Sequence, residues 1–224
     1  MRLILFDIDG TLLSCGPQVR PIFASALFDV LGTEGRLEAY DFAGKTDPTI
    51  VLELAASGGV PRAEALPRIA EVRALYAERL AERLDPARMT LLPGVVDLLE
   101  GLAGREDVAL GLLTGNWRPC ATIKLAPFDL NRFFEIGAFG CDGIDRCELP
   151  PIALARAEER FGRRFTSEDT LIVGDSVHDV ACAHAHGIPC LAVATGRTTA
   201  EHLTAAGAER VIANLQGERA LAFA

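Results

Sequence analysis

The chain has 224 residues, of which 50% are hydrophobic, and its formal net charge is −9. This length is enough for one large domain or for a domain that carries an insertion. The negative charge argues against nucleic acid and anionic membranes as main partners, because both require clustered Lys and Arg side chains. The sequence also lacks a stretch with the length and apolarity of a membrane span.

The cysteines lie far apart and form no CxxC pair. The first apolar run ends after four residues at Asp7, so a signal peptide is not expected. We therefore expect reduced thiols and a cytoplasmic protein. The cysteines are Cys15, Cys120, Cys141, Cys147, Cys182 and Cys190.

Short apolar runs alternate with helical patterns along most of the chain. Helical patterns cover 95–103, 152–161 and 177–186. This alternation predicts an α/β fold, in which a parallel sheet is covered by helices on both faces. The runs that resemble buried strands are 3–6, 108–113, 134–138, 170–173, 190–193 and a less distinct one at 210–213.

One region departs from this alternation. Between residues 15 and 86 the sequence has no clear strand, but helical patterns cover 21–31, 49–57 and 63–84. The last of these is dense in Ala, Glu, Arg and Leu, which are good helix formers. We expect an all-helical insertion at 15–86 and a core made of 1–14 and 87–224.

Polar residues follow three of the expected strands. The first strand ends in Asp7-Ile8-Asp9-Gly10-Thr11, the second in Thr114-Gly115-Asn116 and the fourth in Gly174-Asp175-Ser176, with Asp179 four residues beyond Asp175. Ligands of open parallel sheets bind outside the carboxyl ends of the strands. We therefore expect four carboxylates, a hydroxyl and several glycines to meet at one rim.

Clustered carboxylates repel one another unless a hard divalent cation lies between them. Mg²⁺ binds one or two carboxylates together with phosphate oxygens and water. Gly10, Thr114 and the neighbouring turns offer N–H and O–H donors for a phosphate group. Asp7 can then act as a nucleophile, and Asp9, two residues further, can act as general acid and base.

The elements DIDGT, LLTGN and VGDSVHD, in this order, resemble the haloacid dehalogenase superfamily of phosphohydrolases. The resemblance implies a Rossmann-like three-layer core with an inserted helical cap. It implies Asp7 as nucleophile and Mg²⁺ ligand, and Asp9 as acid and base with its backbone carbonyl on the metal. Asp175 would be a metal ligand, and Asp179 would bind the metal through water or orient the site.

The resemblance further implies that the Thr114 hydroxyl binds phosphate and that the backbone of Gly115 or Asn116 assists. The third motif of the superfamily usually supplies a lysine, but the segment 145–151 reads DRCELPP and has none. Arg146 can take this role, since a guanidinium can bridge a phosphate and a carboxylate. Lys124, on the helix after the second motif, is the alternative.

Gly44-Lys45-Thr46 lies inside the helical insertion. It is not a P-loop, because Ala39 stands where that pattern needs glycine and no apolar strand precedes it. The segment resembles the substrate loop of phosphoglycolate phosphatase-like relatives, which implies that Lys45 and Thr46 contact substrate. The alternative is a helix start with Thr46 or Asp47 as the cap.

The preferred function is a Mg²⁺-dependent phosphomonoesterase that acts on a small phosphate ester and is phosphoglycolate phosphatase-like. A β-phosphoglucomutase-type phosphomutase would retain both Asp7 and Asp9. A haloacid dehalogenase would not need the acid at Asp9, and a non-catalytic binding module would not need the whole set of acids. A monomer or homodimer is expected by default.

Overall fold

The computed structural model describes residues 1–217, and residues 218–224 at the end of the expected core lie outside the described part. A six-stranded sheet has the order β5-β4-β1-β6-β7-β8. Each neighbouring pair is parallel, so the carboxyl ends of all six strands lie at one edge of the sheet. The strands are β1 (Arg2–Phe6), β4 (Val108–Leu113), β5 (Ile136–Ala138), β6 (Thr170–Gly174), β7 (Cys190–Val193) and β8 (Arg210–Ile212).

The strand order confirms the expected parallel α/β architecture. Alternate residues of β1 face opposite layers, as expected for a strand buried on both sides. Leu3 and Leu5 pack with residues of α7, α8 and α9. Ile4 and Phe6 pack with residues of α5 and α6. The core helices are α5 (Val95–Ala103), α6 (Arg118–Leu125), α7 (Leu149–Phe161), α8 (Val177–His184) and α9 (Ala200–Ala205).

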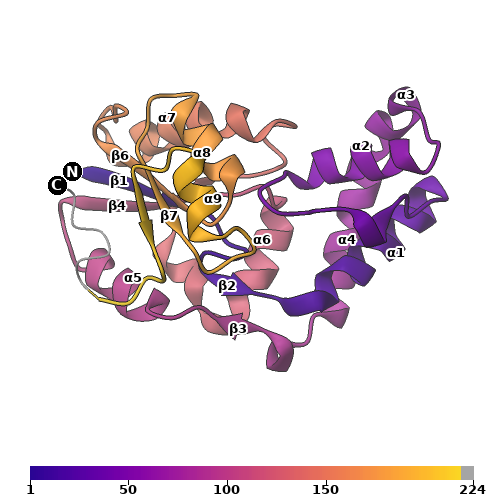
Figure 1. The fold of residues 1–224 in the computed structure, drawn as a ribbon, viewed down its shortest axis with the longest axis horizontal. Helices are drawn as coiled ribbons and strands as arrows, with labels where there is room; N and C mark the ends of the chain where they lie inside the picture. The colour runs from indigo at the N-terminus through magenta and orange to yellow at the C-terminus, as the bar shows by residue number, and fades with distance from the viewer. Residues whose placement is uncertain (218–224) are drawn as a thin grey trace.

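The helices between Ser14 and Thr90 form a separate group beside the sheet, drawn in violet in Figure 1. Their shared apolar core contains Phe23 and Tyr76, whose ring centroids are 4.9 Å apart. Trp117, which directly precedes α6, stacks on Phe23 at 6.2 Å. The core of this group therefore includes a residue from the sheet-bearing part of the chain. The helices are α1 (Val19–Leu31), α2 (Asp47–Ser57), α3 (Arg62–Ala65) and α4 (Ile69–Arg83).

Two very short strands join this helical group to the sheet-bearing part. β2 (Leu13–Ser14) pairs antiparallel with β3 (Thr90–Leu91). The chain thus leaves and re-enters the core at adjacent points, and the group is attached through one paired connection.

The structure corrects three expected elements. The helix expected at 63–84 is divided, because Leu66–Arg68 forms a 3₁₀ turn around Pro67 before α4 begins. Pro67 lacks the N–H that a continuous α-helix would use. The helix expected from 152 begins at Leu149, and the one expected to reach 186 ends at His184. No helix within residues 1–217 has the length and apolarity needed to cross a membrane.

Candidate active site

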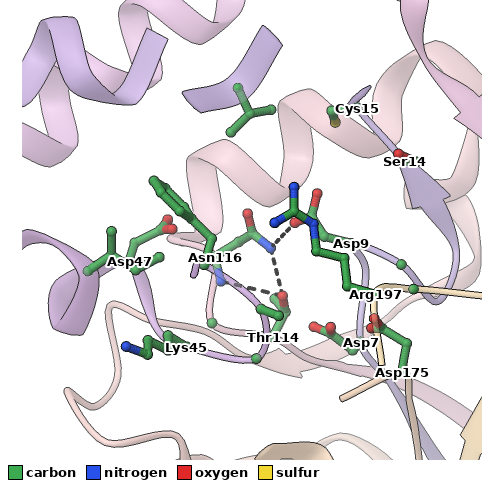
Figure 2. Close-up of a pocket in the computed structure, with 18 of the residues that line it drawn as sticks. Asp7, Asp9, Ser14, Cys15, Lys45, Asp47, Thr114, Asn116, Asp175 and Arg197 are labelled. Atoms are coloured by element: carbon green, nitrogen blue, oxygen red, sulfur yellow. Dashed lines mark hydrogen bonds between the residues drawn. The ribbon is translucent and has the colours of Figure 1, made fainter. Parts of the chain in front are cut away.

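Three neighbouring strand ends form the rim of one cavity. Asp7 follows β1, Thr114 follows β4 and Asp175 follows β6, and β1 lies between the other two strands. The cavity has a volume of about 530 Å³ and is lined on its other side by residues of α1, α2 and the loop before α2. Figure 2 shows Asp7, Asp9 and Asp175 gathered on one side of it, with Lys45 and Asp47 on another. The expected meeting of polar groups at the sheet edge is therefore present.

Three buried carboxylates lie close together at the base of the cavity. Oxygen atoms of Asp7, Asp175 and Asp179 lie within 4.8 Å of one another. Burial raises the pKa of Asp7 to about 6, against the opposing effect of Arg146. Burial and then the charges of Asp179 and Asp7 raise the pKa of Asp175 to about 8. Burial and mutual repulsion therefore disfavour the charged forms of Asp7 and Asp175 in the absence of a cation.

The backbone around Asp175 leaves room for this carboxylate and little else. A Cβ atom at Gly10 or Gly196 would overlap the Asp175 carboxyl group, and Gly10 has a φ of +87°. The Thr11 hydroxyl donates to Asp175 Oδ1 at 3.2 Å. The Thr195 hydroxyl donates to the carbonyl of Gly10 at 2.6 Å and fixes the two loops against each other. Both glycines are thus required by a close approach to an acidic side chain.

Arg146 is the counter-charge of the buried acids. Its Nη2 lies 3.1 Å from Asp7 Oδ1 and 2.5 Å from Asp179 Oδ1. The same nitrogen donates to the carbonyl of Leu113 at 3.1 Å, and Nη1 donates to the carbonyl of Gly44 at 3.3 Å. Burial acts to lower the pKa of Arg146, but Asp179 and Asp7 raise it further, so the guanidinium stays charged.

Asp179 serves two partners through its two oxygens. Its Oδ2 accepts from the Ser176 backbone N–H at 3.0 Å and from the Ser176 hydroxyl at 2.6 Å, which completes a capping box at the start of α8. Its Oδ1 accepts from Arg146. The GDSVHD segment therefore fixes the start of a helix and the position of Arg146 at the same time.

Lys124 occupies a different position and does not compete with Arg146. Its Nζ donates to Asp9 Oδ2 at 2.6 Å and to Asn116 Oδ1 at 2.6 Å. Asn116 Nδ2 in turn donates to Asp9 at 2.8 Å and to the Thr114 hydroxyl at 2.8 Å, as Figure 2 shows. Burial acts to lower the pKa of Lys124, but Asp9 is the main group that raises it well above its usual value. Two cations thus hold the two acids of DIDGT separately.

Two neighbouring residues of the loop before α2, Lys45 and Thr46, have different surroundings. Lys45 lines the cavity, but its Nζ is paired with Glu53 Oε2 at 2.5 Å and contacts the Tyr40 hydroxyl at 3.2 Å. Thr46 is the N-cap of α2 and accepts from the Thr49 backbone N–H at 3.2 Å, while its hydroxyl donates to the carbonyl of Ile144. Thr46 is therefore a helix cap that does not line this cavity, as in the alternative given from the sequence, and its contact with substrate stays a prediction.

This loop is also docked on the strand-end turn that contains Gly115. The carbonyl of Gly115 accepts from the Asp47 backbone N–H at 2.8 Å, and Asp47 Oδ2 accepts from the Trp117 backbone N–H at 2.8 Å. A Cβ at Gly115 would overlap the carbonyl of Lys45. Burial raises the pKa of Asp47 to about 7. Gly115 thus permits the contact between the helical group and the rim.

The acidic cluster fits a divalent cation by its own chemistry. Its donors are carboxylate oxygens, which Mg²⁺ prefers, and they lie close enough to share one ion. The pKa values of Asp7 and Asp175 are raised mainly by burial and further by neighbouring acids, and a bound cation would counteract both effects. The described residues are therefore suited to hold a hard cation between Asp7 and Asp175.

Sequence reasoning missed several cavity residues. Arg197 follows the end of β7, and Arg20 lies at the start of α1; both line the cavity. The rule that ligands bind beyond strand ends, applied also to the strand at 190–193, would have indicated Arg197. Arg20 carries no comparable signal, because its position depends on how the helical group folds over the sheet.

Comparisons with known proteins agree with this architecture. The haloacid dehalogenase-like hydrolase family matches residues 4–193. A phosphoglycolate phosphatase of Pseudomonas putida is 27% identical over 216 residues, which cover 96% of this chain and 77% of that protein. A phosphoglycolate phosphatase of Photorhabdus laumondii is 27% identical over 220 residues, covering 96% and 89%. The crystal structure of a predicted phosphatase from Clostridium acetobutylicum superposes with a TM-score of 0.70 at 19% identity, covering 94% of this chain and 92% of that one.

The chain belongs to the haloacid dehalogenase-like hydrolase family, since that family covers most of its length. Within the family it is similar to the phosphoglycolate phosphatases of Pseudomonas putida and Photorhabdus laumondii. The resemblance stated from DIDGT, LLTGN and VGDSVHD is thereby confirmed.

Proposed function

We propose that this enzyme is a Mg²⁺-dependent phosphomonoesterase that hydrolyses a small phosphate ester of the phosphoglycolate type through an aspartyl-phosphate at Asp7. The observation that carries the proposal is the separate support of two neighbouring acids. Asp7 is buried against Arg146, whereas Asp9 is held at the cavity by Lys124 and Asn116. The first arrangement suits a fixed nucleophile, and the second suits a group that exchanges a proton with the ligand.

In the first step, a carboxylate oxygen of Asp7 forms a bond to phosphorus while the bond from phosphorus to the ester oxygen breaks. Asp9 gives its proton to the departing alkoxide, which leaves as the alcohol. The Thr114 hydroxyl and the backbone N–H groups at Gly115 and Asn116 hold the phosphoryl oxygens. The Arg146 guanidinium keeps the Asp7 carboxylate in position.

In the second step, Asp9 takes a proton from water as the water oxygen bonds to phosphorus. The bond from phosphorus to Asp7 breaks, so inorganic phosphate leaves and the Asp7 carboxylate is restored. Asp7, Asp175 and the backbone carbonyl of Asp9 would hold Mg²⁺, with Asp179 positioned behind them. When bound, Mg²⁺ supplies Lewis-acid neutralisation of charge on the phosphoryl oxygens.

The helical segment 15–86 is proposed as the cap that closes over the ligand. Its loop before α2 already contacts the rim through Asp47 and Gly44. A closed cap would exclude bulk water during the first step and select the organic part of the ester. The phosphomutase alternative differs in that the phosphoryl group would return to a sugar phosphate instead of reaching water.

The test is phosphate release from a panel of small phosphate esters, with and without Mg²⁺. We expect release to require Mg²⁺ and to fall at least about a thousandfold in Asp7→Asn, because the nucleophile is removed. Circular dichroism and thermal unfolding would check that this variant is folded. Asp97→Asn makes the same change at an exposed position of α5 and should retain full release.

Two outcomes would contradict the proposal. Near-normal release by Asp7→Asn would remove the aspartyl-phosphate from the mechanism. Isomerisation of a sugar phosphate without release of inorganic phosphate would instead establish the phosphomutase, and release of halide from a haloacid would establish the dehalogenase.

A further inference from the structure

The cavity contains more positively charged side chains than phosphoryl transfer uses. Arg146 and Lys124 are already engaged by the catalytic acids. Three further cations line the same cavity and, within residues 1–217, form no ion pair with the catalytic acids. These cations are Arg20, Lys45 and Arg197.

Two of these three are held by other groups. Lys45 is neutralised by Glu53 at 2.5 Å and lies over the Tyr40 ring. Arg20 donates through Nη1 to the carbonyl of Tyr40 at 2.9 Å and through Nη2 to that of Leu37. Its guanidinium also lies over the Phe42 ring. Arg20 and Lys45 therefore fasten the loop before α2 to its own helices.

Arg197 is different, because its side chain is 73% exposed and its ion pair, with Asp41, has a long separation. Asp41, itself 68% exposed, lies 4.0 Å from Arg197 Nη1. An exposed pair at this separation contributes little to stability and is readily exchanged for a better partner. Figure 2 shows the long side chain of Arg197 directed into the cavity.

The backbone that carries Arg197 is nevertheless fixed. The preceding Gly196 packs directly on the Asp175 carboxyl group, and the Thr195 hydroxyl donates to Gly10. The loop therefore holds the start of the Arg197 side chain beside the acidic cluster, while its guanidinium can move between Asp41 and the cavity. Such an arginine can form paired hydrogen bonds with a carboxylate or a phosphate.

We propose that Arg197 recognises a second anionic group on the substrate, either a carboxylate or a further phosphate, and releases Asp41 when it does so. This inference rests on the proposed phosphatase function and adds a specificity-determining residue to it. A second anion in this cavity would face repulsion from Asp7, Asp9 and Asp175, and Arg197 is the cation best placed to offset it.

The test compares phosphoglycolate with 2-hydroxyethyl phosphate, which keeps the two-carbon frame and lacks the carboxylate. The readout is the ratio of the two kcat/KM values, and ethylene glycol bisphosphate replaces phosphoglycolate in a second arm. Loss of a charge-assisted hydrogen bond predicts that Arg197→Met lowers the ratio about 10- to 100-fold. The arm in which the ratio falls more identifies the second anion as carboxylate or phosphate.

A second variant, Asp41→Asn, should change the ratio of kcat/KM values in the opposite direction. Asp41→Asn removes the competing carboxylate and one repelling charge, so the ratio should rise about two- to fivefold. Arg105→Met is the matched control, because Arg105 is an exposed arginine paired with Asp107 at 2.7 Å before the start of β4, away from the rim. It should leave both kcat/KM values unchanged.

The result that would overturn the inference is a proportional change for all esters in both Arg197→Met and Asp41→Asn. In that case the pair would only link the cap to the core. A wild-type enzyme that hydrolyses both esters without preference would overturn the inference and leave the phosphatase function intact. Absence of hydrolysis of any ester would overturn the proposed function itself, and the inference with it.

Discussion

Arg146 connects the buried acids with the loop before α2 through a single guanidinium. One terminal nitrogen contacts Asp7 and Asp179, and the other donates to the carbonyl of Gly44. A lysine could supply the charge but not this fork, because its donors lie on a single nitrogen. The Nε of Arg146 is a buried side-chain nitrogen without a hydrogen-bond partner within the described residues. Arg146 therefore links the buried acids directly to the loop before α2.

The first prediction concerns the stability of Arg146 variants. Arg146→Met leaves Asp7 and Asp179 buried without a counter-charge, so the free energy of unfolding should fall by about 3–5 kcal/mol. Arg146→Lys restores the charge and should recover most of this loss. Urea unfolding of the metal-free proteins at pH 7 measures both values. Equal stability of Arg146→Met and the wild type would show that Arg146 does not stabilise the buried acids.

For single residues, the sequence allowed us to predict which side chains lie at the rim, but not which side chains they contact. Asp7, Thr114 and Asp175 could be placed at one rim, because each directly follows a strand and the strands are parallel, and Asp9 lies two residues beyond Asp7. The choice between Arg146 and Lys124 could not be made, because it depends on which acid each side chain reaches across the fold. Distances of this kind are set by helix packing that local sequence does not encode.

At the element scale, α2 begins at the cap–core contact, and its first turn depends on Thr46. The Thr46 hydroxyl satisfies the Thr49 backbone N–H and also donates to the carbonyl of Ile144 in another part of the chain. Asp47, the first residue of α2, accepts from the Trp117 N–H. Helix start and docking are therefore one structural feature.

The second prediction concerns Thr46 as the N-cap of α2. Thr46→Ala should lower the free energy of unfolding by about 1–2 kcal/mol, because a helix N-cap and a buried hydroxyl contact are lost. Thr46→Ser keeps the hydroxyl and should lose much less. Chemical unfolding of the two variants beside the wild type provides the measurement. Similar losses in both would mean that the methyl group of Thr46, and not its hydroxyl, matters.

All the strands of the six-stranded sheet were predictable, including β5 and β8 with three residues each, whereas the two-residue strands were not. β2 and β3 have two residues each, too few to show the alternation that identifies a strand. Pro67 gave a visible signal for the break before α4, since proline interrupts a helix interior. The extent of α7 could not be predicted closely, because helix ends depend on capping contacts.

At the scale of the whole molecule, stability should depend on pH through the acidic cluster. The folded-state pKa values of Asp7 and Asp175 are raised to about 6 and 8, above those of an unfolded chain. The folded state therefore binds more protons than the unfolded state between about pH 4 and 8. Stability from these groups is fully present below pH 4 and is lost as the pH rises through 8.

The third prediction is that the metal-free enzyme becomes less stable between pH 5 and 9. Mg²⁺ should reverse this trend, adding about 2.7 kcal/mol when it is present at a hundredfold excess over its dissociation constant. Thermal unfolding across this pH range, with EDTA or with Mg²⁺, measures the effect. Asp175→Asn should flatten the upper part of the metal-free profile. Asp47, with a pKa of about 7, adds a change in the same direction that Mg²⁺ does not relieve. A flat profile in EDTA would contradict the assignment.

The antiparallel pair of β2 and β3 has a consequence for how such an enzyme can diversify. Since the helical segment begins and ends on adjacent paired strands, the distance between its two attachment points is fixed by backbone hydrogen bonds and not by the helices themselves. Length and sequence between these points can therefore change at little entropic cost to the sheet. The segment can therefore be replaced as a unit. A different helical group inserted between Ser14 and Thr90 would present new side chains to an unchanged set of acids.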